Sequence, residues 1–256
     1  GGFPAAGIAG AAIASSVSEA VSLLFFIIYT SMTADKRKYG FRRAFTLRPH
    51  LLKGILSISG WTMVQSFISV SIWFIFFLAI EHLGERPLAV TNIVRNISAL
   101  LIMVISAFAT TAGALISNQI GAGEQRCLFK TCGMTLKLTY AILIPLLIIL
   151  CLFPESVLRA FTDSPSLIAA SVNSVYVMAS STLIMAPSFI LFNAVSGTGN
   201  TRAGFIMEMI SLAVYTAVIY YGIIRLKPDV ALCWFSEHVY GVTLIILAWW
   251  YLKSGK

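Results

Sequence analysis

Among the charged residues inside stretches apolar enough to cross a membrane, Glu19, Arg95 and Glu237 stand out. A charged side chain in hydrocarbon is costly, so such residues usually face a hydrated cavity or a partner of opposite charge. A carboxylate in a cavity can bind a proton or Na⁺. We therefore take these three residues as ion-coupling candidates, with Glu19 either protonated by burial or paired with Arg95 or a transported cation. Glu208 lies nearer the end of its stretch, and two interpretations stay equally open for it: it reaches water or pairs with Arg202, or it faces a cavity like the other intramembrane charges.

Uncharged polar residues recur at three- and four-residue spacing in the same stretches, which places them on shared helix faces. Two interpretations stay open for them. In the first, serine, threonine and asparagine side chains form hydrogen bonds between neighbouring membrane helices, and we favour this interpretation for the serines. In the second, the same side chains line the wall of a transport cavity. The candidates for lining a cavity are Gln65, Ser69, Asn92, Asn96 and Asn193.

The composition identifies the elements that must position these residues. Of 256 residues, 58% are hydrophobic and only 11% are charged, which is typical of an integral membrane protein. The apolar runs are too long for strands, so they are predicted to be helices. We predict an all-α, polytopic membrane protein with seven spans, at Ala5–Ser31, Gly54–Leu83, Pro87–Ile116, Thr131–Phe153, Ser166–Ala194, Ala203–Leu226 and Ala231–Leu252.

The basic residues predict the orientation of the spans. Thirteen of them lie in alternate connections, beginning with the Lys36 loop, and four lie in the others, with Arg95 inside a span. The positive-inside rule places the Lys36 loop and the C-terminus in the cytoplasm, with the spans in the inner (cytoplasmic) membrane. The net charge of +8 then reflects loops that face anionic lipid rather than nucleic-acid binding.

A short repeat relates the first span to the last. Ser18-Glu19-Ala20-Val21 and Ser236-Glu237-His238-Val239 both precede an aliphatic run that ends among basic residues. A parallel repeat about an axis along the membrane normal produces this pattern. We expect the last helix of an N-terminal lobe at 1–32, a basic cytoplasmic linker at 33–53, a six-helix C-terminal lobe at 54–252 and a cytoplasmic tail at 253–256. The chain is then expected to be part of a longer protein.

Glycines and prolines mark candidate hinges and turns at Gly121, Gly123, Pro187, Gly197 and Gly199. Glycine allows positive φ and tight reversal between spans, although simple helix termination explains the same residues. Pro187 is expected to interrupt its span and bend it, while Thr201 and Arg202 are expected to cap and anchor the next helix.

The remaining chemistry is sparse. The cysteines and the three histidines form no metal-binding spacing, so no metal site and no cofactor are expected. An intramembrane hydrolase that uses Ser196 with His238 is a weak alternative, because the two residues belong to opposite ends of their spans. We expect no enzyme.

Three segments resemble motifs of MATE (multidrug and toxic compound extrusion) transporters. ISNQIGAGE at 116–124 resembles the segment after the family's eighth helix, SGTGNTR at 196–202 the turn before its eleventh, and GIAGAAIAS at 7–15 the opening of its sixth. The resemblance covers the whole chain and implies helices six to twelve of twelve. It implies a secondary antiporter that exports amphipathic or cationic compounds in exchange for H⁺ or Na⁺, with the remaining lobe and membrane lipid as partners. Alternatives are a flippase for lipid-linked precursors, which has a similar fold, or an inactive truncated product.

The sequence departs from the family at its best-known acidic positions. The span expected to be the seventh helix reads Ser-Phe-Ile-Ser-Val at 66–70, and the span expected to be the tenth has no Asp or Glu between Leu167 and Asn200. The family's cation site in the C-terminal lobe therefore cannot be transferred to this chain. This departure is why Glu19 and Glu237 become the preferred titratable groups.

Overall fold

The computed structural model describes residues 7–33, 48–124 and 127–254, and within these ranges the chain is almost entirely helical, with no β-strand. The chain divides into two compact units, Gly1–Lys53 and Gly54–Lys256. The first unit contains α1 (Gly7–Thr33) and the beginning of α2 (Pro49–Glu81). The second unit contains the rest of α2 and α3 (Glu85–Gly121), α4 (Leu128–Leu152), α5 (Pro154–Leu158), α6 (Pro165–Gly197), α7 (Thr201–Val218), a π-helical segment η3 (Ile219–Arg225), α8 (Val230–Cys233) and α9 (Ser236–Ser254).

Seven of these segments are long and apolar enough to cross a membrane, which confirms the predicted all-α, polytopic architecture. The sixth combines α7 with η3, and the seventh combines α8 with α9. The helices extend beyond several predicted ends, since α2 begins at Pro49 and α3 continues to Gly121. Most of the predicted cytoplasmic linker (34–47) and the end of the tail (255–256) lie outside the described residues.

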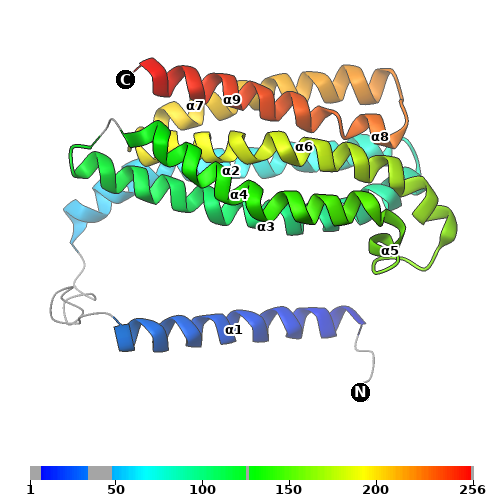
Figure 1. The fold of residues 1–256 in the computed structure, drawn as a ribbon, viewed down its shortest axis with the longest axis horizontal. Coiled ribbons are helices and arrows are strands. Elements are labelled where there is room, and N and C mark those ends of the chain that lie inside the picture. Colours follow the sequence, from blue (N-terminus) through cyan, green and yellow to red (C-terminus); the bar gives the residue numbers. More distant parts are fainter. Residues whose placement is uncertain (1–6, 34–47, 125–126, 255–256) are drawn as a thin grey trace. The chain divides into compact units, whose positions relative to one another are not determined.

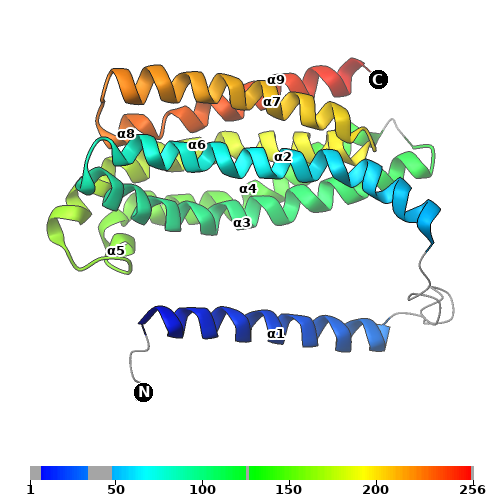
Figure 2. The same ribbon diagram turned by 180° about the vertical axis from the view of Figure 1, so that it is seen from behind.

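The centre of the second unit is the crossing of α3 and α6, with α4 beside both helices and α7 beside α9 (Figures 1 and 2). Glycines allow the two backbones to meet. A Cβ atom built on Gly197 would lie 2.5 Å from the carbonyl oxygen of Gly113, and one built on Gly113 would lie 2.9 Å from that of Asn193. Gly197 is therefore a packing residue as well as the last residue of α6.

The prediction that Pro187 interrupts its span is wrong, because α6 runs without a break from Pro165 to Gly197. Proline has no N–H, so the carbonyl oxygen of Leu183, four residues earlier, loses its usual helical donor. Tyr140 of α4 supplies a replacement, with its hydroxyl donating to that oxygen at 2.7 Å. A neighbouring helix thus satisfies the backbone group that the proline leaves unpaired, as a membrane interior requires.

α2 meets the other helices of the second unit through large side chains. Phe76 is fully buried and packs against Tyr215 of α7 and against Trp234, with ring centroids 6.4 and 5.7 Å apart. Nearer the start of the helix, Trp61 contacts Phe205 of α7 at 5.2 Å. These aromatic contacts place one face of α2 opposite α7, which matters for the site described below.

The glycines of the two predicted turns differ in backbone conformation. Gly123 and Gly199 have φ values of 81° and 85°, a conformation that only glycine adopts easily, whereas Gly121 and Gly197 are helical. The predicted capping role of Thr201 belongs instead to Asn200, whose side-chain oxygen accepts the N–H of Ala203.

Candidate functional site

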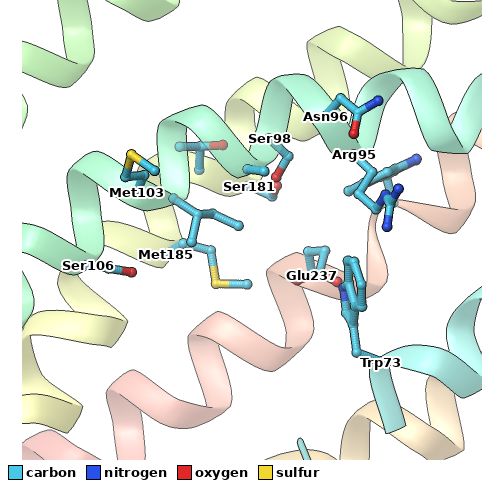
Figure 3. Close-up of a pocket in the computed structure, with 13 residues that line it drawn as sticks. Trp73, Arg95, Asn96, Ser98, Met103, Ser106, Ser181, Met185 and Glu237 are labelled. Atoms are coloured by element: carbon cyan, nitrogen blue, oxygen red, sulfur yellow. The ribbon is translucent and has the colours of Figure 1, made fainter. Parts of the chain in front are cut away.

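Two adjoining cavities open in the second unit. The first, which we call the Arg95 cavity, has a volume of about 470 Å³ and lies among α2, α3, α6 and the start of α9 (Figure 3). The second, the Glu208 cavity, has a volume of about 410 Å³ and lies among α2, α6, α7 and α9. Both are within the size range of small-molecule sites. Their shared wall consists of Trp73, Ile102, Met185 and Glu237.

Glu237 lies in this shared wall, next to the point where the helix is interrupted between α8 and α9. α8 ends at Cys233 and α9 begins at Ser236, so Glu237 stands in the first turn of a new helix, where the helix dipole favours negative charge. Tyr215 of α7 donates its hydroxyl hydrogen to Oε1 of Glu237 at 2.8 Å. Among the described residues this is the only side-chain hydrogen bond to Glu237, so Oε2 has no protein donor.

Glu208 is the acidic residue whose surroundings the sequence left open. It is only 4% exposed, and it neither reaches water nor pairs with Arg202. Its Oε1 accepts hydrogen bonds from Ser69 at 2.8 Å and from Tyr240 at 2.9 Å, and Tyr240 also lies 3.1 Å from Oε2. Arg202 is exposed and stacks over Trp61 at 5.9 Å.

The two carboxyl groups form reciprocal pairs between α7 and α9. α7 supplies Glu208 and Tyr215, α9 supplies Glu237 and Tyr240, and each glutamate bonds to the tyrosine of the other helix. The tyrosine rings meet edge to face, with centroids 5.8 Å apart. A sequence signal for this arrangement exists, since a seven-residue spacing and a three-residue spacing each place Glu and Tyr on one helix face. Only the packing of α7 on α9 shows that the faces match.

Arg95 extends from α3 toward Trp73 and Glu237 (Figure 3). Its guanidinium lies 5.8 Å from the Trp73 ring centroid and 5.4 Å from that of Phe77, which are cation–π distances. Its Nε is buried without a hydrogen-bond partner. Arg95 forms no ion pair with any residue that the structure describes.

The predicted cavity-lining residues divide into two groups. Ser69 lines the Glu208 cavity and Asn96 lines the Arg95 cavity. Gln65, Asn92 and Asn193 line neither, and the side chain of Asn193 instead donates to the carbonyl oxygen of Phe189 within its own helix. Glu19 lies near the middle of α1, in the first unit, and is not among the residues that line these cavities.

His238 does not pair with Ser196. Its Nε2 lies 2.9 Å from the hydroxyl oxygen of Ser180, and its ring stacks on Phe235. Across the described ranges, no group of three or more His, Cys, Asp or Glu side chains is arranged to hold a metal ion. The ionisable chemistry of the two cavities therefore rests on two carboxyl groups, two phenols and one guanidinium.

Comparison with known proteins shows similarity to a family of membrane transporters. The MatE family model matches residues 62–221. The chain is 23% identical over 223 residues to the uncharacterized transporter YisQ of Bacillus subtilis and 26% identical over 222 residues to the probable multidrug resistance protein NorM of Thermotoga maritima, and each alignment covers 82% of this chain. The chain spans about half the length of these curated relatives, 46% and 45% respectively.

Solved structures show the same fold. The Vibrio cholerae MATE transporter VcmN, as its D35N mutant, superposes with a TM-score of 0.72 at 16% identity, over 80% of this chain and 47% of that one. A transporter of the MOP superfamily from Pyrococcus furiosus gives a TM-score of 0.69 at 14% identity, over 78% and 44%. With seven candidate membrane spans and a family match over more than half of its length, this chain belongs to the MatE family of multi-pass membrane transporters.

Proposed function

We propose that the intact protein is a secondary antiporter that exports amphipathic or cationic small molecules in exchange for H⁺ or Na⁺, and that Glu237 is the coupling carboxyl group of this lobe. The observation that carries the proposal is the reciprocal pairing of Glu208 and Glu237 with two tyrosines beside a cavity. The relationship to a probable multidrug resistance protein supports the substrate class.

The two glutamates have different surroundings, which gives them different roles. Glu208 accepts hydrogen bonds from two hydroxyl groups, those of Ser69 and Tyr240, and the Tyr240 hydroxyl lies within hydrogen-bond distance of both carboxyl oxygens. Glu237 has one oxygen held by Tyr215, while no described residue donates to the other, and the side chain lines both cavities. A proton or Na⁺ can reach such an oxygen, and a cationic substrate can compete for it. Glu208 then acts as a positioning residue that holds Tyr240.

The proposed orientation places the Lys36 loop and the C-terminus in the cytoplasm of a cell whose inner membrane holds the protein. The excess of basic residues in alternate connections supports it. In a background whose four native cysteines are replaced by serine, a single cysteine introduced as Lys38→Cys should react with a membrane-impermeant maleimide only after the cells are opened. Arg159→Cys, in a connection on the opposite side, should react in intact cells. The reverse pattern would refute the orientation.

The coupling role is tested by substrate efflux from proteoliposomes that contain the intact protein under an imposed H⁺ or Na⁺ gradient. Glu237→Gln keeps the size of the side chain and an acceptor for Tyr215 but cannot titrate, so gradient-driven efflux should fall to the background level. Glu155→Gln is the matched control, because Glu155 is exposed in α5 and lines neither cavity. Unchanged coupled efflux and pH dependence in Glu237→Gln would assign Glu237 to the scaffold.

A further inference from the structure

The Arg95 cavity holds a guanidinium and a carboxyl group that do not pair with each other. Arg95 and Glu237 both line it, yet neither forms an ion pair with any described residue. Glu237 is bonded to Tyr215, and the guanidinium of Arg95 lies over the rings of Trp73 and Phe77. Arginine cannot release its proton in a protein, so the positive charge persists at every physiological pH.

The position of Arg95 makes this unpaired charge costly. The residue lies in α3, a membrane-spanning helix, and its Nε has no acceptor although it is buried. Cation–π contacts with Trp73 and Phe77 offset part of the cost, but a ring face is a weaker partner than an anion. A buried charge inside a membrane protein generally has a partner. The guanidinium therefore has hydrogen-bond donors available for an anionic acceptor, which the described residues do not supply.

The two charged side chains lie toward one end of the cavity, and hydroxyl groups such as that of Ser106 occur elsewhere along it (Figure 3). Arg95, Asn96, Trp73 and Glu237 gather at one end, whereas Met103 and Met185 lie toward the other (Figure 3). Methionine side chains fit apolar groups of different shapes. A ligand that matches this cavity has an apolar body and a head that carries both an anionic and a cationic group.

We propose that the Arg95 cavity binds amphipathic zwitterions, with the ligand's carboxylate at Arg95 and its ammonium group at Glu237. The guanidinium fork is suited to a planar carboxylate, because it donates two parallel hydrogen bonds. This inference rests on the proposed function in one respect: the ammonium group binds to the carboxyl group of Glu237, which otherwise binds the coupling ion. Zwitterion and ion then exchange at Glu237, while Arg95 selects ligands that also carry an anion.

The test uses binding, which does not depend on ion coupling. The intact protein in detergent is titrated with ε-dansyl-lysine, a fluorescent zwitterion, and separately with its methyl ester, which keeps the ammonium and the apolar body but lacks the carboxylate. Energy transfer to the dansyl group from tryptophan reports binding, since Trp73 and Trp234 line the cavity. The zwitterion should bind more tightly than the ester, by roughly tenfold for one charge-assisted contact.

Arg95→Gln should remove this preference, because the affinity for the zwitterion should fall roughly tenfold while the affinity for the ester changes little. Arg95→Lys keeps the charge but loses the fork, so an intermediate preference is expected. Arg159→Gln is the matched control, because Arg159 is exposed and lies outside the cavity, and it should preserve the wild-type preference. Binding of the ester by each variant shows that the protein is still folded.

Three results would overturn the inference. Equal binding of both probes by the wild-type protein would mean that an acidic group elsewhere in the intact protein already neutralises Arg95. A preference that survives in Arg95→Gln would place the carboxylate at another residue. Displacement of ε-dansyl-lysine by phosphatidylglycerol, in an Arg95-dependent manner, would identify the anion as a lipid headgroup. Each result is independent of whether Glu237→Gln abolishes coupled efflux, so the two proposals can fail separately.

Discussion

Tyr240 holds Glu208 by donating its hydroxyl hydrogen to a carboxylate oxygen 2.9 Å away, which joins α9 to α7 inside the second unit. Tyr215 and Glu237 join the same two helices in the opposite sense at 2.8 Å. The pairs look alike, but the first carboxyl receives hydrogen bonds from two residues and the second from one, since Ser69 adds a second donor only to Glu208. The two tyrosines should therefore differ in what their removal costs.

Tyr240→Phe should lower stability more than it lowers transport. Without the hydroxyl, Glu208 keeps only Ser69 as a donor, and a buried carboxyl loses a charge-assisted bond, at a cost of about 1 kcal/mol in a membrane interior. The midpoint of thermal unfolding in detergent measures this cost. Tyr221→Phe is the control, because Tyr221 is 66% exposed and its hydroxyl bonds to no described residue. Equal midpoints for the two variants would contradict the role assigned to Tyr240.

Tyr215→Phe should affect transport more than stability. The change removes the one side-chain hydrogen bond that orients Glu237, while the phenyl ring keeps its contacts with Phe76 and Tyr240. A carboxyl that is no longer held at the cavity wall binds its ion in the productive position less often. We expect coupled efflux to fall roughly tenfold, which corresponds to one lost hydrogen bond. Wild-type efflux rates in proteoliposomes would show that Glu237 needs no positioning by Tyr215.

The contact between Tyr140 and Leu183 should depend on Pro187. In the wild type, Tyr140→Phe leaves the Leu183 carbonyl oxygen without a donor and should cost about 1 kcal/mol. In a Pro187→Ala background, the new N–H at position 187 can donate to that oxygen within the helix, so the same change should cost much less. A double-mutant cycle of unfolding free energies measures the difference. Additive effects would mean that Tyr140 does not substitute for the missing helical donor.

Gly197→Ala should disrupt the crossing of α3 and α6. The added methyl group would lie 2.5 Å from the Gly113 carbonyl oxygen, so one backbone must move, at a cost of about 1–3 kcal/mol. Gly133→Ala is the matched control: Gly133 is also helical, but a Cβ there meets nothing within 4 Å. The control should be neutral or stabilise the helix by up to about 1 kcal/mol. Similar unfolding midpoints for both variants would refute the close approach of the two backbones.

The sequence alone determined the class of protein and the number of spans. Apolar runs of sufficient length have one structural solution in lipid, because every backbone amide must bond within its own segment. It also singled out Glu237, Arg95, Ser69 and Asn96, which line the two cavities. Their place beside the cavities could be expected because charge inside a span and polarity along one helix face are properties of a single segment, whereas an ion-coupling role for Glu237 and Arg95 stays a prediction.

The tertiary structure decided which faces meet. Gln65, Asn92 and Asn193 carry the same polar signal as Ser69 and Asn96 but line neither cavity, since helical periodicity gives a face and not its neighbour. Glu208 was left open for the same reason: its distance from the end of the span allowed contact with water or a cavity, and only the packing of α2, α7 and α9 shows that it is enclosed with Ser69 and Tyr240. A buried carboxyl in a membrane protein is defined by the donors around it, and those come from helices distant in the chain.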